Sequence, residues 1–208
     1  MKSLQETAPV GQAACHNNIN TLMHYAEDQK NKEVHSKREL RQIHQGRIIN
    51  VCQETFFFEG EKPFKTDLIV HPGAAVILPI LDDGTLLLIR QWRRAVGEIL
   101  IEAPAGVIEV GEPKIECAMR ELQEETGYSA ERLTSMGRIL SAPGFCSETL
   151  YLFLAEGLAK NPLPKDEHEA IDLMPLFLEE ALAMIESGEI CDAKTIVLIL
   201  RYAKKCDI

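Results

Sequence analysis

The stretch from Gly106 to Tyr128 constrains the chain most, because it combines clear helix boundaries with a dense set of carboxylates. Pro113 suits the first turn of a helix, and Gly127 suits the residue just beyond its end. We therefore expect a helix over residues 113–126. The side chains expected on its buried face recur at spacings of three and four, and they are Ile115, Ala118, Leu122 and Thr126.

Another face of this helix carries Glu121 and Glu125, one turn apart, with Glu124 beside them. Like charges at this spacing destabilise an isolated helix by about 0.2–0.5 kcal/mol, and a bound divalent cation would offset that repulsion. Clusters of carboxylate oxygens suit Mg²⁺, Mn²⁺ or Ca²⁺ rather than Zn²⁺. Two simpler explanations are a solvated charged face and an ion pair between Arg120 and Glu124.

The spacing of the residues around these carboxylates favours the metal site over the two simpler explanations. Gly106 is followed by five residues, Glu112, seven more residues, and then Arg-Glu-Leu-Gln-Glu-Glu-Thr-Gly-Tyr from Arg120 to Tyr128. This pattern matches the signature of the Nudix hydrolases at every fixed position, so the chain resembles that family. The resemblance implies a loop–helix–loop that holds Mg²⁺, or alternatively Mn²⁺, against a pyrophosphate. It also implies hydrolysis of a nucleoside diphosphate that is linked to another group.

Composition limits the other classes of function. The chain has 208 residues and a formal net charge of −10, which indicates one core domain with an appendage and disfavours binding to nucleic acid or to an anionic membrane. The six cysteines include no Cys-x-x-Cys pair, as expected of reduced thiols. The first 20 residues lack the apolar core of a signal peptide, and the longest apolar run, 74–81, is too short for a membrane span. We therefore expect a cytoplasmic protein.

The chain before residue 72 is expected to form two parts. Residues 1–37 are a polar arm, with a helix expected only near 20–30. Residues 38–71 are expected to form a β-ribbon of two strands, 46–58 and 64–71. Three consecutive phenylalanines, Phe56, Phe57 and Phe58, cannot all face one core, since side chains alternate along a strand. A ribbon this small also needs another surface to cover it, either in its own chain or in a second copy.

Residues 72–208 are expected to form the hydrolase domain. Asp82-Asp83-Gly84 separates two apolar runs, which predicts a hairpin whose two strands are both central. Near the end of the chain, Gly188 should end one helix and Asp192 should cap the next. The order of elements indicates the α+β class and an α/β/α sandwich. The expected strands are 74–81, 85–90, 98–103, 133–140 and 149–155, and the expected terminal helices are 176–187 and 192–203.

A narrower resemblance, to the ADP-ribose pyrophosphatase branch of the family, spans about residues 47–202. Pro143 lies sixteen residues beyond Gly127, the position of a proline in that branch. The other matching segments are 70–74, 90–93, 102–106 and 192–196. This resemblance implies hydrolysis of ADP-ribose to AMP and ribose 5-phosphate. It further implies a homodimer in which the ribbon lies across the partner.

The resemblance also implies roles for particular residues. The expected metal ligands are the Ala105 carbonyl, Glu121 and Glu125, while Glu124 is a further ligand with a catalytic part and Glu148 is the general base. Asp166, Glu167 and Glu169 are alternative bases. Arg120 and Glu112 are expected to form a structural salt bridge. The residues expected to contact substrate are Arg93 and Glu102 near the diphosphate, Pro143 and Gly144 in the loop before the base, and Phe56 against the adenine.

Two kinds of alternative are open. The same chemistry could act on a nucleotide sugar or on NADH, because no residue identifies the sugar pocket. Some domains of this type bind ADP-ribose without cleaving it, but these usually lack motif glutamates that are all present here. A thiol nucleophile at Cys117 or Cys146 lacks a histidine nearby in the sequence.

Overall fold

The computed structural model describes residues 25–164 and 170–207. The chain divides into two compact units, Met1–Ile43 with Cys52–Asp67 and His44–Val51 with Leu68–Ile208. Residues 25–35 form a helix. Most of the polar arm, and the alternative bases Asp166, Glu167 and Glu169, lie outside the described residues. No helix within the described ranges is long and apolar enough to cross a membrane.

The expected two-stranded ribbon is a three-stranded sheet, with β1 (Lys37–Gln45), β2 (Asn50–Phe57) and β3 (Phe64–Val70) side by side in that order. The first strand was missed because all nine of its residues are exposed, so its sequence lacks the apolar alternation that marks a strand. Phe56 is 4% exposed, and its ring stacks on Phe58 with centroids 5.9 Å apart. Phe57 instead lies below the Lys37 ammonium, so the three rings alternate as expected.

Two sheets form the core of the second unit. One has the strand order β7-β4-β9-β8 and the other β10-β5-β6. The first contains β4 (Ala74–Pro79), β7 (Ala105–Val107), β8 (Tyr128–Leu140) and β9 (Thr149–Lys160), and the second contains β5 (Leu86–Arg93), β6 (Glu98–Glu102) and β10 (Ile171–Leu176). The sequence did not reveal β7 or β10, and β8 and β9 are longer than expected.

The hairpin expected at Asp82-Asp83-Gly84 forms only in part. The turn closes through the Leu81 N–H, which donates to the Thr85 carbonyl at 2.9 Å, and Ile80 pairs with Leu86. Beyond that bridge β4 and β5 separate into different sheets. Each is central, as expected, because β4 lies between β7 and the parallel β9 and β5 lies between β10 and β6.

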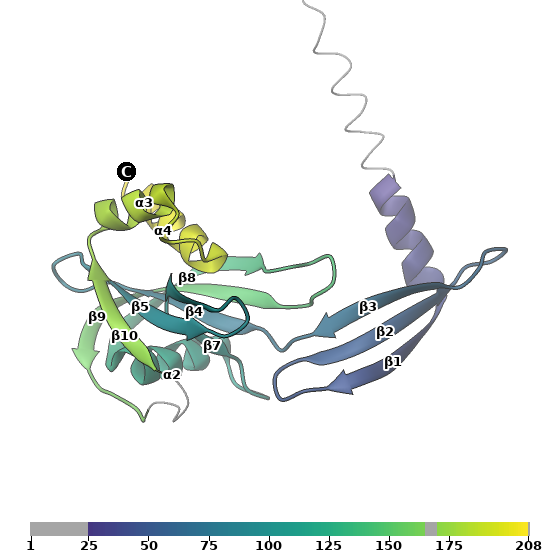
Figure 1. The fold of residues 1–208 in the computed structure, drawn as a ribbon, viewed down its shortest axis with the longest axis horizontal. Helices are drawn as coiled ribbons and strands as arrows, with labels where there is room; N and C mark the ends of the chain where they lie inside the picture. The colour runs from purple at the N-terminus through teal and green to yellow at the C-terminus, as the bar shows by residue number, and fades with distance from the viewer. Residues whose placement is uncertain (1–24, 165–169, 208) are drawn as a thin grey trace, which may run out of the picture. The chain divides into compact units, whose positions relative to one another are not determined.

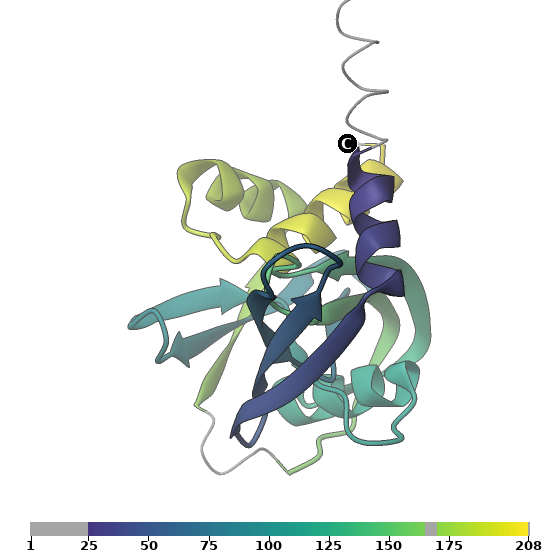
Figure 2. The ribbon, with the colours of Figure 1, turned by 90° about the vertical axis from the view of Figure 1, so that its right-hand side faces the viewer.

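Three helices cover the two faces of the first sheet, with α2 (Lys114–Thr126) on one side and α3 (Leu178–Ser187) and α4 (Ala193–Lys205) on the other (Figures 1 and 2). Alternation along β4 divides the core between them. Ala75 and Ile77 pack with the buried residues of α2, whereas Val76 and Leu78 pack with those of α3 and α4. The expected α/β/α sandwich is therefore confirmed.

The helix expected over 113–126 is confirmed as α2, and Gly127 ends it in the left-handed conformation at φ 79°. Its buried face differs from the expectation. Ile115 is 51% exposed, since it lies at the edge of the stripe that faces the strands. The buried residues of this stripe include two carboxylates, and they are Cys117, Ala118, Glu121, Leu122, Glu125 and Thr126.

Candidate active site

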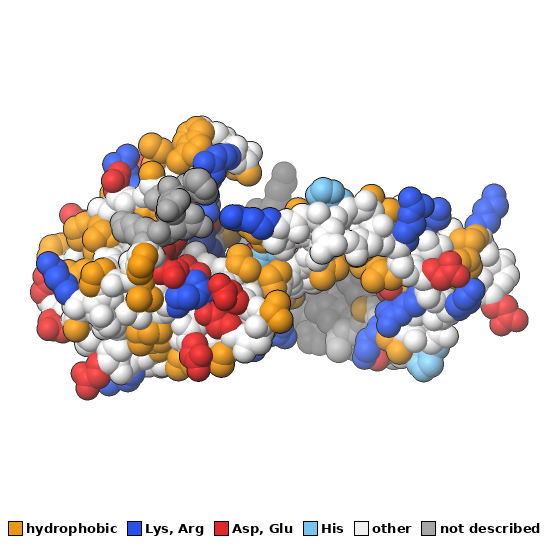
Figure 3. All heavy atoms as spheres, turned by 90° about the horizontal axis from the view of Figure 1, so that it is seen from below, with side chains coloured by type: hydrophobic (Ala, Val, Ile, Leu, Met, Phe, Trp, Pro, Cys, Tyr) orange, Lys and Arg blue, Asp and Glu red, His pale blue; other side chains and the backbone are white. Residues whose placement is uncertain are grey.

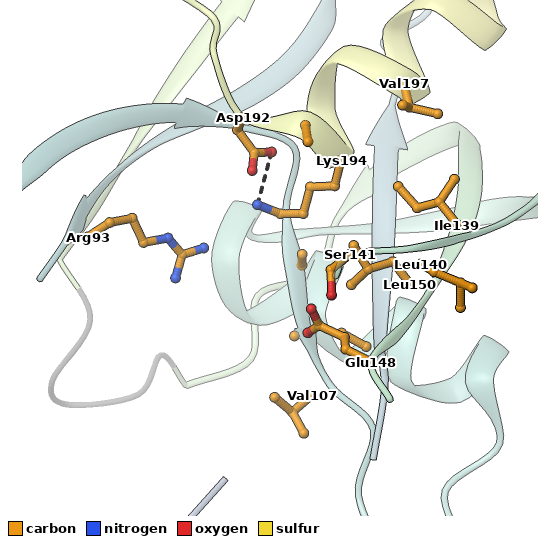
Figure 4. Close-up of a pocket in the computed structure, with 14 residues that line it drawn as sticks. Arg93, Val107, Ile139, Leu140, Ser141, Glu148, Leu150, Asp192, Lys194 and Val197 are labelled. Carbon is orange, nitrogen blue, oxygen red and sulfur yellow. Dashed lines mark ion pairs between the residues drawn. The ribbon is translucent and has the colours of Figure 1, made fainter. Parts of the chain in front are cut away.

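A pocket of about 600 Å³ opens where the two sheets meet the start of α4. Its wall has a charged side and an apolar side (Figure 4). Arg93, Glu148, Asp192 and Lys194 supply the charges, and Ala105 and Gly106 bring the backbone that precedes α2 to the wall. The apolar side is formed by Ala74, Val107, Ile139, Leu140, Leu150 and Val197.

Two cations of the pocket share one buried carboxylate, Glu102, which is 1% exposed. Arg93 donates from Nε and Nη2 to its two oxygens, each at 2.7 Å. Lys194 donates from Nζ to Oε2 of the same carboxylate and also pairs with Asp192 at 3.0 Å. Burial raises the pKa of Glu102, but the bonds from Arg93 and the charge of Lys194 outweigh it and hold the pKa below its ordinary value. Glu102 therefore fixes both cations at the pocket.

Hydrogen bonds also fix the segment that leads into the motif. The Ala103 N–H donates to Thr195 Oγ1 at 2.7 Å, and the Thr195 hydroxyl donates to Asp192 Oδ2. Asp192 accepts from the Thr195 N–H as well, at 3.0 Å, which caps α4 as expected. On the other side, the Pro104 carbonyl accepts from the Ile77 N–H at 2.8 Å. Ala105 and Gly106 thus begin from a rigid backbone.

The two buried glutamates of α2 meet this backbone. Glu125 is 3% exposed, and its Oε2 accepts from the Ala105 N–H at 2.8 Å. Glu121 lies against Gly106 so closely that a Cβ at this position would be 1.9 Å from its carboxyl carbon. The glycine at 106 therefore leaves room for the carboxylate, and any larger residue here would force the end of the Glu121 side chain to move.

Arg120 joins the remaining motif glutamates. Its Nε and Nη2 donate to the Glu112 carboxylate at 2.8 and 3.1 Å, which confirms the expected salt bridge. Its Nη1 donates to Glu121 and, at 3.0 Å, to Glu124, so the alternative ion pair with Glu124 also exists. The bonds from Arg120 hold the pKa of Glu112 below its ordinary value. Acidic side chains gather around a basic one on the face that carries α2 (Figure 3).

The donors present fit a hard divalent cation. Among the described residues, no three Asp, Glu, His or Cys side chains converge as a ready-made metal site. The expected ligands are instead two carboxylates and a backbone carbonyl, and both carboxylates reach the Ala105–Gly106 backbone. An all-oxygen set of this kind suits Mg²⁺ or Mn²⁺. The nearby Cys117 thiol is a poor nucleophile, since burial raises its pKa to about 12.

The remaining expected residues lie in different places. Glu148 lines the pocket directly before β9. Pro143 and Gly144 are exposed in the preceding loop and are not among the residues that line the pocket. Phe56 is covered by Phe58 and Phe64, so its face is not open to a base in this arrangement. Sequence reasoning missed Lys194 as a pocket residue, although the Asp-Ala-Lys-Thr segment was part of the narrower resemblance.

Glu102→Gln should destabilise the fold by about 2–4 kcal/mol at pH 7. A fully buried pair costs about 3–5 kcal/mol when one partner is removed, but Arg93 reaches solvent. Because the folded-state pKa of Glu102 is lowered, its contribution is present above the ordinary glutamate pKa and is lost as pH falls through the folded value. Urea unfolding of both proteins between pH 7 and pH 3 should show the difference shrinking with acid. A difference that does not depend on pH would contradict this assignment.

Comparisons with known proteins agree on one family. The model of the NUDIX domain matches residues 70–196. The chain is 38% identical over 156 residues to an ADP-ribose pyrophosphatase of Bacillus subtilis, covering 74% of this chain and 84% of the relative. It is 36% identical over 141 residues to a GDP-mannose pyrophosphatase of Yersinia enterocolitica, covering 64% of this chain and 73% of the relative.

A solved structure supports the same architecture. The crystal structure of an ADP compounds hydrolase superposes with a TM-score of 0.73, covers 83% of this chain and 94% of its own, and is 23% identical in sequence. At this identity the likeness concerns the fold alone. The family match covers more than half of the chain, and it includes the helix whose glutamates meet the Ala105–Gly106 backbone. The chain belongs to the NUDIX domain family.

Proposed function

We propose that this protein is a divalent-metal-dependent pyrophosphatase that hydrolyses ADP-ribose to AMP and ribose 5-phosphate. The observation that carries the proposal is the meeting of Glu121 and Glu125 with the Ala105–Gly106 backbone at the wall of a pocket that also holds Arg93. The relative named ADP-ribose pyrophosphatase supports this substrate, because it is similar over most of both chains.

The pocket meets the main difficulty of this chemistry. A diphosphate resists attack because its negative oxygens repel a nucleophile. Glu121, Glu125 and the Ala105 carbonyl would hold Mg²⁺ or Mn²⁺, with Glu124 as a further ligand, and such an ion supplies charge neutralisation and an activated water. Arg93 adds a cation that Glu102 holds in a fixed orientation, which suits it to bind the diphosphate.

A carboxylate must accept the proton of the attacking water. The described pocket wall carries Glu148 and Asp192, and Asp192 already caps α4 and pairs with Lys194, so Glu148 is the candidate. Figure 4 shows its carboxylate pointing toward the side of the pocket that Ser141 and Lys194 line. Asp166, Glu167 and Glu169 are the alternatives if Glu148 binds substrate instead.

A second candidate substrate is a nucleotide sugar, favoured by the relative named GDP-mannose pyrophosphatase. A panel of ADP-ribose, GDP-mannose, NADH and UDP-glucose, with Mg²⁺ and with products identified by chromatography, tests the proposal. We expect the highest kcat/KM for ADP-ribose, with AMP and ribose 5-phosphate as products. A higher kcat/KM for GDP-mannose would replace the substrate but keep the chemistry, and binding without turnover would replace the enzyme by a binding module.

We also propose that the protein is a cytoplasmic homodimer in which the three-stranded sheet forms part of the interface. The sheet carries exposed apolar side chains at Leu40 (63%), Ile43 (49%) and Phe64 (51%). Exposed apolar side chains on so small a sheet are typical of an interaction surface. Leu40 and Ile43 lie on opposite faces of β1, and an interface between copies would cover one of these faces.

Exchanging Glu121 or Glu125 for Gln should lower kcat by at least about 100-fold, because each change removes a ligand charge. Mn²⁺ affinity, measured by electron paramagnetic resonance without substrate, should fall as well. Glu116→Gln is the matched control, since Glu116 is exposed on the same helix. Wild-type Mn²⁺ affinity in both Glu121→Gln and Glu125→Gln would contradict the metal assignment.

Glu148→Gln should lower kcat by about 10²–10⁴-fold with little change in KM, as expected of a group that acts on the attacking water. Steady-state kinetics on ADP-ribose at saturating Mg²⁺ measure both constants. A raised KM with an unchanged kcat would instead make Glu148 a substrate contact and move the base to the segment that holds Asp166, Glu167 and Glu169.

Leu40→Lys and Ile43→Lys, made singly, should identify the face of β1 that lies in the proposed interface, because side chains 40 and 43 lie on opposite faces and a charge on the covered face should turn the dimer into a monomer. Light scattering after size-exclusion chromatography measures the mass. Leu200→Lys is the control, since Leu200 is 48% exposed on α4 and should leave the mass unchanged. A wild-type protein that elutes as an active monomer would rule out the dimer.

A further inference from the structure

The loop that carries Glu148 is bound to the chain segment that enters β4. The Ile69 N–H donates to the Phe145 carbonyl at 2.7 Å, and the Ser147 N–H donates to the Ile69 carbonyl at 2.9 Å. These bonds form a parallel bridge between Ile69 and Cys146. The loop therefore has a fixed backbone two residues before Glu148.

The side chain of Ser147 adds two bonds to the same segment. Its Oγ accepts from the His71 N–H at 2.9 Å and donates to the His71 carbonyl at 3.3 Å. One hydroxyl thus satisfies both backbone groups of His71. We call the four hydrogen bonds between residues 69–71 and residues 145–147 the clamp. Because Ser147 immediately precedes Glu148, the clamp fixes the direction in which the Glu148 side chain leaves the backbone.

The His71 ring lies beside the Glu148 carboxylate. Its side chain is 8% exposed, and Nδ1 is 3.5 Å from Glu148 Oε1. The same Nδ1 accepts from the Gly73 N–H at 3.0 Å, which fixes the ring orientation and places the proton of a neutral ring on Nε2. The contact with Glu148 is therefore one of packing, and the ring restricts where the carboxylate can lie.

Gly73 makes this arrangement available. Its φ is +97°, and a Cβ at this position would be 2.9 Å from the Thr149 carbonyl oxygen. Only a glycine can both turn the chain here and direct its N–H at the His71 ring. Gly73 therefore holds the His71 ring in place, while the clamp holds the His71 backbone.

We propose that Ser147 and His71 are positioning residues that hold the Glu148 carboxylate in the pocket wall. The proposal rests on the proposed function, since it requires that Glu148 act on the substrate or on the attacking water. Neither residue lines the pocket, so both act through Glu148. Misplacing a reacting group by about 1 Å can cost 100-fold in rate, so loss of these contacts should slow turnover by up to that factor.

A double-mutant cycle tests the proposal. Ser147→Ala and His71→Ala should each lower kcat/KM by about 10- to 100-fold. In a Glu148→Gln background the same changes should have almost no further effect, because the group that they position is already lost. The cycle uses kcat/KM, so it reads the coupling whether Glu148 is the base or a substrate contact. If Ser147→Ala and His71→Ala lowered kcat/KM by the same factor with and without Glu148→Gln, the proposal would be overturned.

A conservative variant separates the turn from the ring. Asparagine at position 71 can accept the Gly73 N–H through its side-chain oxygen but cannot fill the space beside Glu148. His71→Asn should therefore recover only part of the activity lost in His71→Ala. Full recovery would show that the ring has no part in positioning. Ser187→Ala, on the exposed end of α3, is the control for hydroxyl loss.

Hydrogen exchange gives a readout that does not depend on activity. The amides of Ile69, His71, Gly73 and Ser147 should be protected in the wild type, and Ser147→Ala should expose the His71 amide while the core strands stay protected. A wild type that cleaves no diphosphate refutes the proposed function, but it leaves this measurement intact. Unprotected amides at His71 and Ser147 in an active wild type would refute the clamp itself.

Discussion

The contact between two carboxylates of α2 and the backbone of Ala105 and Gly106 is the constraint on which the site depends. Glu121 and Glu125 lie on the buried stripe of the helix, where an unpaired charge would cost several kcal/mol. Glu125 is satisfied in part by the Ala105 N–H, and Glu121 by Arg120. The helix can bury these acids because the backbone and Arg120 bond to them. The same residues therefore stabilise the sandwich and form the candidate site.

Local cations explain how a chain with a net charge of −10 can bind an anion. Arg93 and Lys194 approach the pocket from β5 and α4, and Glu102 from β6 holds both. The field at the pocket is therefore set by a few fixed charges, and the net charge of the protein acts mainly at longer range. Arg120 has a different task, since its guanidinium joins the carboxylates of Glu112, Glu121 and Glu124.

Sequence reasoning succeeded for the helix boundaries and the motif, where residues close together in the sequence carry the signal. Pro113 and Gly127 marked α2, Asp192 marked the start of α4, and the family resemblance implied the salt bridge between Arg120 and Glu112. It failed where tertiary context decides. The strand β1 has no buried face to produce alternation, and β7 contains only three residues. The separation of β4 from β5 after a good hairpin turn depends on partners that arrive much later in the chain. The pocket contacts of Lys194 likewise depend on a helix 92 residues beyond Glu102.

The central claim is that Gly106 lets the Glu121 carboxylate reach the backbone, and that this approach builds the metal site. Mn²⁺ binding to Gly106→Ala, measured by electron paramagnetic resonance in the folded protein without substrate, tests it most directly. The added Cβ would occupy the place of the Glu121 carboxylate, so we expect Mn²⁺ affinity to fall by at least about 10-fold while circular dichroism still shows the native fold. Wild-type Mn²⁺ affinity in a folded Gly106→Ala protein would contradict the account.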